Sequence, residues 1–177
     1  MADPERPVIE GLTAEGARTH RCSLVALLQN VVDGGASVGF LPPLSAEEAA
    51  AYWDSVATAL ADGGRRLWVA RDSNGTVVGS VQLDLDRRAN GNHRAELAKL
   101  MVLTSARRRG IGRMMMEAAE TEARSIGRTT LVLDTRQGDP SEALYRDMGW
   151  RPAGVIPRYA RSADGTLHAT AFYYKLL

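Results

Sequence analysis

The 177-residue sequence has a single cysteine, Cys22, and two lysines among its 22 basic residues. One cysteine excludes an intrachain disulfide and a cysteine-rich zinc site. Its position in an apolar helical pattern is typical of a small buried side chain, with a reactive thiol as the alternative. His20 and His93 show no metal-ligand spacing with Cys22, so we expect no metal site. A chain of this length buries about 70% of its unfolded surface on folding, so it needs no such cross-links.

Long hydrophobic runs and an excess of charge are also missing. No apolar run approaches the roughly 18 residues that a membrane span requires, and the polar start of the sequence lacks the apolar stretch of a signal peptide. We therefore expect a cytoplasmic protein without membrane contacts. Its 22 basic and 21 acidic residues give a net charge of +1, which is too small an excess to favour nucleic acid. We expect no nucleic-acid partner, and the sequence leaves the oligomeric state open.

Hydrophobic spacing predicts alternating helices and strands without an internal repeat or linker. Helices are expected over 14–33, from Ser45 to about Gly63, over 111–126 and over 141–148. Strands are expected over 67–71, 76–85, 95–103 and 129–134, followed by a two-stranded ribbon over 154–177 that turns at Asp164-Gly165. The strand, helix and strand between residues 95 and 134 form a βαβ unit with parallel strands and a right-handed crossover.

The most informative segment is the glycine turn inside that unit. Arg107, Gly110 and Gly112 have the spacing Arg-x-x-Gly-x-Gly. The two glycines let the backbone approach a ligand closely, and the free N–H groups at the start of a helix attract an anion such as a pyrophosphate. No Gly-Lys-Ser/Thr follows, and the third glycine of a dinucleotide fingerprint is missing. A solvated basic turn is the alternative interpretation.

These motifs resemble those of the Gcn5-related N-acetyltransferases (GNAT). In that family an Arg/Gln-x-x-Gly-x-Gly/Ala motif binds the pyrophosphate of acetyl-CoA, and Leu144-Tyr145 with Gly149-Trp150 match the family's Leu-Tyr-x-x-x-Gly-aromatic pattern. Gly138 departs from it, because the family often has Asn at this position. The resemblance implies one α/β acetyltransferase domain over 1–177. Its sheet would be mixed and mostly antiparallel, splayed at a parallel central pair, with helices on both faces.

The resemblance also implies acetyl-CoA as the cosubstrate and assigns its contacts. The expected cofactor-binding residues are Leu100, Met101, Val102, Leu103, Arg107, Arg108, Arg109, Gly110, Ile111, Gly112 and Arg113. Backbone N–H groups of the strand would stabilise the oxyanion that forms during acyl transfer.

Three residues have candidate catalytic roles. The resemblance implies that Glu96 and Asp134 together remove the proton of the attacking group through water, and that Tyr145 returns a proton to the leaving CoA sulfur. Structural roles are the alternatives. Tyr145 fits an aromatic core position of a helix, Glu96 an ion-paired strand carboxylate, and Asp134 a capping or turn carboxylate.

A narrower resemblance, to the acetyltransferases that confer tabtoxin resistance, concerns the acceptor. It is carried by residues 34–40, 94–96 and 99–103 and by the segment from Asp164 to His168. It implies a small-molecule acceptor, an amine or hydroxyl of a β-lactam toxin. Another metabolite, a protein amine and a non-catalytic CoA sensor stay open as alternatives.

We expect the acceptor to lie where the glycine-rich loop and the C-terminal ribbon converge over the carboxyl edge of the βαβ unit. The expected contacts are Gly35, Ser37, Phe40, Arg158, Tyr159 and His168. Arg158 would bind a carboxylate, and the acidic pair an ammonium, which suits a zwitterion. His168 is a candidate second base, with an ordinary surface histidine as the alternative.

Overall fold

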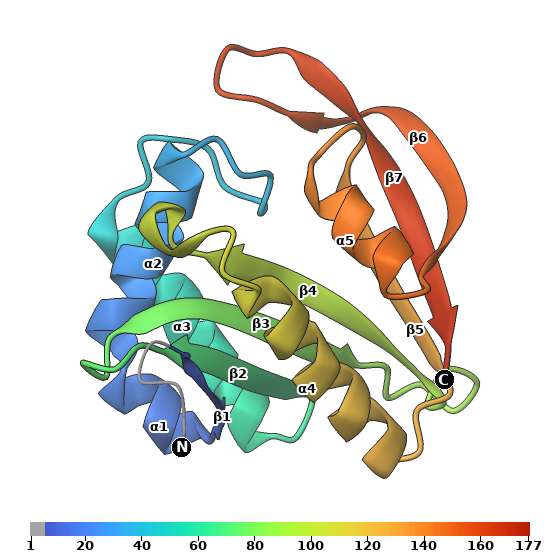
Figure 1. The fold of residues 1–177 in the computed structure, drawn as a ribbon, viewed down its shortest axis with the longest axis horizontal. Coiled ribbons are helices and arrows are strands. Elements are labelled where there is room, and N and C mark those ends of the chain that lie inside the picture. The colour runs from blue at the N-terminus through green and yellow to red at the C-terminus, as the bar shows by residue number, and fades with distance from the viewer. Residues whose placement is uncertain (1–5) are drawn as a thin grey trace.

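The computed structural model describes residues 6–177 and contains a seven-stranded sheet in the order β1-β2-β3-β4-β5-β7-β6 (Figure 1). The polar residues 1–5, on which the expected lack of a signal peptide partly rests, lie outside the described part. The elements are β1 (Val8–Leu12), α1 (Ala14–Thr19), α2 (Arg21–Asp33), α3 (Ala46–Ala61), β2 (Arg65–Arg71), β3 (Val77–Leu85), β4 (Arg94–Val102), the short η1 (Thr104–Ala106), α4 (Ile111–Ser125), β5 (Thr130–Arg136), α5 (Ser141–Asp147), β6 (Arg151–Arg161) and β7 (Leu167–Leu176).

Helices cover both faces of this sheet, and each face has its own core. On one face the apolar stripe of α4, which includes Ile111, Met115 and Ala119, packs with α5 residues against β3, β4 and β5. On the other face, α1, α2 and α3 enclose a second core that contains Leu24, Leu28 and other buried aliphatic residues. The α/β class, the mixed sheet and the helices on both faces are therefore confirmed.

The centre of the sheet is the place where two neighbouring strands separate. Among the paired strands, β4 and β5 alone run parallel, and their pairing extends only from Arg94 opposite Thr130 to Glu96 opposite Val132. Beyond Glu96 the strands diverge, and β5 pairs with β7 as far as Arg136. This confirms the predicted splay and leaves one edge of β4 without a strand partner among the described residues.

Four local predictions need correction. The expected helix over 14–33 is two helices separated at His20, and β1, which pairs with β2 at the sheet edge, was not predicted. Strand β6 begins at Arg151 instead of near 154. Cys22 is exposed, because the buried stripe of α2 runs through Leu24 and Leu28 on the opposite side of the helix. The turn at Asp164-Gly165 is confirmed, with a φ of +84° at Gly165.

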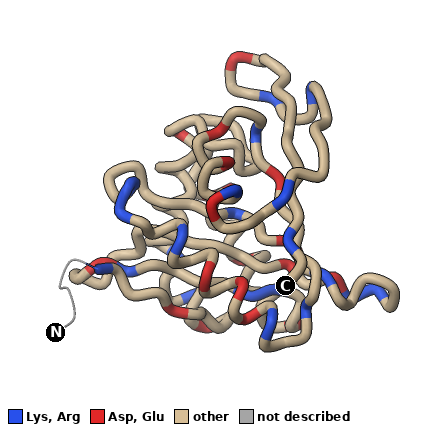
Figure 2. The backbone as a smooth tube through the Cα atoms, turned by 45° about the vertical axis from the view of Figure 1, so that its right-hand side comes forward, with Lys and Arg blue, Asp and Glu red and all other residues tan. Residues whose placement is uncertain are grey.

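Charges of both signs are interspersed along the chain, as Figure 2 shows. Many lie within ion-pair distance of one another, as do Arg21 with Asp54 at 2.8 Å and Arg94 with Asp86 at 2.6 Å. None of the helices in residues 6–177 has both the length and the apolar character needed to cross a membrane.

Candidate active site

The glycine turn lies between the end of β4 and the start of α4. Gly110 is the N-cap of α4 with a φ of +76°, and Arg108 has a φ of +66°. Arg107 Nε donates a hydrogen bond of 3.4 Å to the carbonyl oxygen of Val102, which ties the turn to β4. The first N–H groups of any α-helix have no intrahelical acceptor. The turn therefore presents backbone donors and the positive end of the α4 dipole to an anion.

Space for a ligand at this turn depends on its two glycines. A Cβ built on Gly110 would have no described atom within 4 Å, whereas one built on Gly112 would lie 3.4 Å from Leu144 Cδ2. Ile111 is buried and anchors the helix start, and Arg113 lies 3.7 Å from Asp147 on α5. The predicted cofactor residues of the turn are thus brought together, with the side chains of residues 107–109 exposed around the glycines.

The second half of β4 lies next to this turn. Met101 is buried in the core formed with α1–α3, while the half-buried Leu100 and Val102 pack toward the α4 side, and Leu103, just after β4, packs against both cores. Residues 100–102 belong to the part of β4 that no longer pairs with β5. An extended ligand can pair with such a free strand edge through main-chain hydrogen bonds.

Glu96 and Asp134 lie on either side of the point where β4 and β5 separate. Glu96 is opposite Val132, and Asp134 follows two residues later on the same face of β5. Burial and then the Asp134 charge raise the pKa of Glu96, and burial raises the pKa of Asp134, opposed by Lys99. Both carboxyls still reach solvent. The two expected bases therefore share one electrostatic environment.

Lys99 also affects the pKa values of Glu96 and Asp134, and sequence reasoning did not identify it as functional. It lies at a bulge in β4 with a φ of +51°, and its Nζ is 6.0 Å from the ring centroid of Tyr52. Burial lowers the pKa of Lys99, while the Asp134 charge opposes this effect. A Cβ on Gly39 would lie 3.4 Å from Lys99 Nζ, so the α2–α3 loop (residues 34–45) reaches this amine. Its one sequence signal is that lysine is rare in this chain.

Tyr145 on α5 is almost completely buried among aromatic rings. It is 6% exposed, and its ring centroid lies 5.9 Å from that of Tyr173 and 6.4 Å from that of Trp150. Burial raises the pKa of Tyr145 to about 12, with a hydrogen bond to Ser141 acting in the opposite direction. The hydroxyl therefore keeps its proton at neutral pH and is available as a proton or hydrogen-bond donor. This geometry accommodates both the packing role and the proton-donor role.

A buried carboxylate holds α5 in place. Glu142 accepts hydrogen bonds from Gly138 N at 2.5 Å, from Arg146 Nη2 at 2.6 Å and from the Tyr173 hydroxyl. The Tyr173 bond is the main reason that the pKa of Glu142 is lowered. Gly138 serves as a turn residue with a φ of +84° whose N–H donates a hydrogen bond to Glu142.

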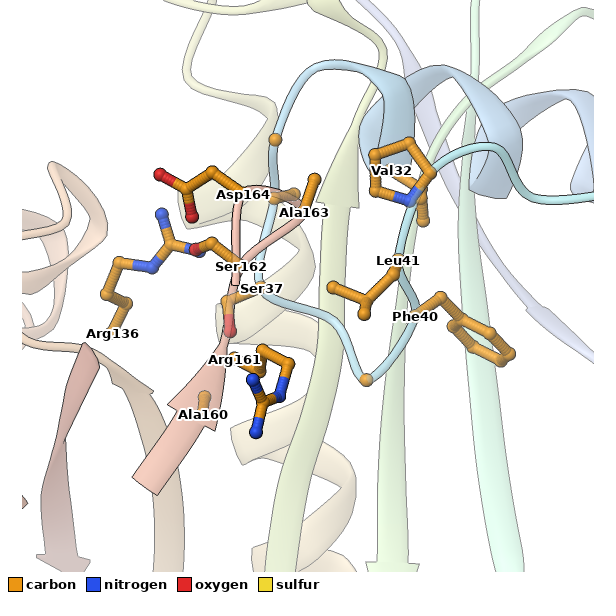
Figure 3. Close-up of a pocket in the computed structure, with 14 residues that line it drawn as sticks. Val32, Ser37, Phe40, Leu41, Arg136, Ala160, Arg161, Ser162, Ala163 and Asp164 are labelled. Carbon is orange, nitrogen blue, oxygen red and sulfur yellow. The ribbon is translucent and has the colours of Figure 1, made fainter. Parts of the chain in front are cut away.

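A cavity of about 510 Å³ lies between the α2–α3 loop and the β6–β7 turn (Figure 3). The loop side includes Gly35, Ser37 and Phe40, as predicted for the acceptor site. The facing side is formed by Arg136 and by residues 160–164. Its volume is in the range of small-molecule sites.

The other three predicted acceptor contacts do not line this cavity. Arg158 is exposed with a φ of +55°, Tyr159 is 55% exposed with its ring 5.5 Å from that of Phe172, and His168 is half-buried on β7. For Arg158 and Tyr159 the reason is a bulge between Ile156 and Ala160, which changes the side of the ribbon that successive β6 residues face. Arg136 and Arg161 are the arginines of the cavity in place of Arg158.

Comparison with curated proteins shows partial relatives. An IAA acetyltransferase from Azospirillum brasilense is 37% identical over 95 residues, which is 53% of this chain and 60% of the relative. An uncharacterized N-acetyltransferase in the hisH-hisA intergenic region of the same organism is 34% identical over 110 residues, which is 61% and 63%. The matched part therefore spans less than two thirds of these relatives.

Solved structures share the fold over almost the whole chain. A GCN5-related N-acetyltransferase from Kribbella flavida superposes with a TM-score of 0.81 at 21% identity, covering 99% of this chain and 100% of that one. A phosphinothricin acetyltransferase from Sinorhizobium meliloti, in complex with acetyl-CoA, has a TM-score of 0.75 at 22% identity, covering 97% and 89%. Residues 39–150, well over half of the chain, match the model of the Acetyltransferase (GNAT) family. The chain therefore belongs to the acetyltransferase (GNAT) family.

Proposed function

We propose that this protein transfers the acetyl group of acetyl-CoA to an amine or hydroxyl of a small molecule. The observation that carries the proposal is the junction of three features at the centre of the sheet. They are the anion-binding turn before α4, the free edge of β4 and the carboxylates Glu96 and Asp134 where the splay begins. Family membership supports this reading, and the S. meliloti relative is described in complex with acetyl-CoA.

The chain's own groups fit acetyl-CoA. Backbone N–H groups between Arg108 and Arg113 would hold the pyrophosphate, because a cosubstrate anion there gains from the α4 dipole and meets no side chain at Gly110. The pantetheine arm would lie along residues 100–103 as an added strand. N–H groups of this segment would stabilise the developing oxyanion of the thioester carbonyl.

Direct attack in a ternary complex accounts for the remaining residues. The acceptor nitrogen or oxygen would bond to the thioester carbon while its proton passes through water to Glu96 and Asp134. The C–S bond would then break, and Tyr145 would give its proton to the leaving thiolate. Raised carboxyl pKa values suit the base, because a base with a pKa nearer to the working pH accepts a proton more effectively. No cysteine is required, and Cys22 is exposed on α2.

A small acceptor is favoured over a protein by the α2–α3 loop. This loop reaches Lys99 and forms one wall of a bounded cavity, whereas an extended peptide would need an open groove. A tabtoxin-type β-lactam is one candidate within this class, beside other amine-bearing metabolites. The proposal also includes residues 1–177 acting as one catalytic domain in the cytoplasm.

The test is thiol release from acetyl-CoA with a panel of small amines, β-lactam amines and lysine peptides, followed by mass analysis of the products. We expect acetylated small molecules. Faster acetylation of peptides than of every small acceptor would overturn the acceptor class. Acetyl-CoA binding without transfer to any acceptor would favour a CoA sensor.

A further inference from the structure

We propose that the acceptor carries a carboxylate in addition to its amine, and that Arg136 and Arg161 bind this carboxylate in the cavity beside the α2–α3 loop. The inference rests on the proposed acetyl transfer, whose acceptor it narrows.

Arg136 has a positive charge that is not neutralised by an ion pair with the described residues. It is half-buried at the end of β5, and its Nη2 donates a hydrogen bond of 2.9 Å to Ser162 Oγ. Its Nε is buried without a hydrogen-bond partner, and no described carboxylate lies within ion-pair distance of it. A guanidinium has five N–H donors, so most of its binding capacity is unused. A carboxylate is the group that matches its planar fork.

Arg161 supplies a second cation on the same wall of the cavity. It is exposed, donates a 3.3 Å hydrogen bond to the Gly165 carbonyl oxygen and forms no ion pair with the described residues. Asp164 is the one acidic residue among the described lining residues, and its Oδ1 accepts the N–H of Thr166 at 2.9 Å. Figure 3 shows both arginines on the side of the cavity opposite Leu41 and Phe40. The lining is therefore cationic, with Ser37 and Ser162 as neutral donors.

Arg136, which lines the cavity, lies on the same strand as Asp134. Asp134 and Arg136 are two residues apart on one strand and so face the same side of the sheet, about 7 Å apart along the backbone. An amine near Asp134 and a carboxylate near Arg136 would therefore belong to one small molecule whose charges are separated by several bonds. On the other wall, Gly39 lies next to Lys99, which places the loop beside the same carboxylate pair.

Matched acceptor pairs test the inference. We would measure kcat/KM for γ-aminobutyrate against n-butylamine and for δ-aminovalerate against n-pentylamine. We expect the wild-type protein to prefer the amino acids by about ten- to a hundredfold, the range of one or two charge-assisted hydrogen bonds. Arg136→Gln and Arg161→Gln should each reduce this preference through KM, while kcat/KM for the alkylamines changes little.

Two further variants sharpen the test. Arg151→Gln, an exposed arginine of β6 outside the cavity, is the matched control and should keep the preference. Loss of preference in Arg158→Gln instead of Arg161→Gln would contradict the inference. Melting temperatures verify that each variant is folded, and Arg161→Gln gives a result even if Arg136→Gln is destabilised.

Equal kcat/KM for both members of each pair would overturn this inference while acetyl transfer itself stands. Binding gives an answer independent of turnover. Calorimetric titration of the CoA-loaded protein with δ-aminovalerate should show binding to wild type that weakens about tenfold or more in Arg161→Gln. No binding to wild type would also overturn the inference. By contrast, failure of every acceptor, charged or not, to release thiol would count against the proposed function.

Discussion

The charge of Asp134 on β5 raises the pKa of Glu96 on β4, next to the point where the two strands separate. Burial raises the pKa of Glu96 first, and the negative charge of Asp134 raises it further. Lys99 from the bulge of β4 has the opposite effect on both carboxyls, and Asp84 and Arg65 contribute from β3 and β2. Removing the charge of Asp134 and removing the charge of Lys99 should therefore shift the pH profile of the reaction in opposite directions.

Asp134→Asn should move the acidic limb of the kcat/KM profile to lower pH. The base accepts a proton only when ionised, so activity is lost as pH falls through its pKa, and removing the Asp134 charge lowers the pKa of Glu96. Turnover should fall as well, because one of the two carboxylates is gone. Glu117→Gln, an exposed residue of α4, is the control and should leave the limb in place. If the acidic limb stays at the same pH in Asp134→Asn, the charge of Asp134 does not affect the pKa of the base.

Lys99→Gln should move the same limb to higher pH. Its ammonium lowers the pKa of Glu96 and of Asp134, so a neutral side chain releases both toward higher values. The pH–rate profile of the variant, measured at constant ionic strength, checks the direction of this shift. A shift to lower pH would mean that Lys99 does not act on the base through its charge.

Gly112→Val should weaken acetyl-CoA binding, because β-branched bulk would be added where the turn backbone approaches the pyrophosphate. The folded protein should tolerate a smaller change, Gly112→Ala, whose Cβ would lie 3.4 Å from the flexible Leu144 side chain. Gly110→Ala adds the cost of a positive φ, roughly 1 kcal/mol. The control is Gly75→Ala in the β2–β3 turn, which carries a φ of +81° far from α4 along the chain. Equal CoA affinity in all variants, measured by calorimetry, would contradict the proposal that the pyrophosphate binds at this turn.

Tyr145→Phe should lower kcat about 10²-fold and leave acetyl-CoA affinity unchanged, if the hydroxyl protonates the leaving sulfur. The ring stays, so packing against Trp150 and Tyr173 is preserved. Tyr174→Phe on β7 is the comparison variant and should turn over as wild type does. Wild-type turnover in Tyr145→Phe would assign Tyr145 to core packing alone.

The sequence predicted those parts of the fold that repeat a strong local pattern. The βαβ unit was found because the apolar stripe of α4 and the glycine turn are readable along the chain. Strand β1 was missed because it is short and gains its place from pairing with β2, a contact distant in sequence. The break between α1 and α2 at His20 was missed because the helical spacing of apolar residues continues across it.

The candidate site shows the same division. The glycines of the turn and Tyr145 of the Leu-Tyr-x-x-x-Gly-aromatic pattern were recognisable directly in the sequence. The acceptor side depends on two bulges, one at Lys99 and one between Ile156 and Ala160, and a bulge changes which residues face the site without a clear sequence signal. Sequence reasoning therefore could not show that Arg136 and Arg161 line this cavity while Arg158 does not, or that Lys99 lies near the carboxylates.

The cavity beside the α2–α3 loop is lined mainly by two chain segments, residues 32–42 and 160–164. Residues 39–150 match the family model, so residues 39–42 and Arg136 are the lining residues that lie inside the match. Most of the cofactor machinery lies inside the matched stretch, and most of the cavity wall lies at its ends or beyond them. We therefore expect most of the residues proposed to select the acceptor to lie in different segments from those proposed to bind acetyl-CoA. Exchanging these two segments with those of a relative should change the preferred acceptor while the acetyl donor is kept.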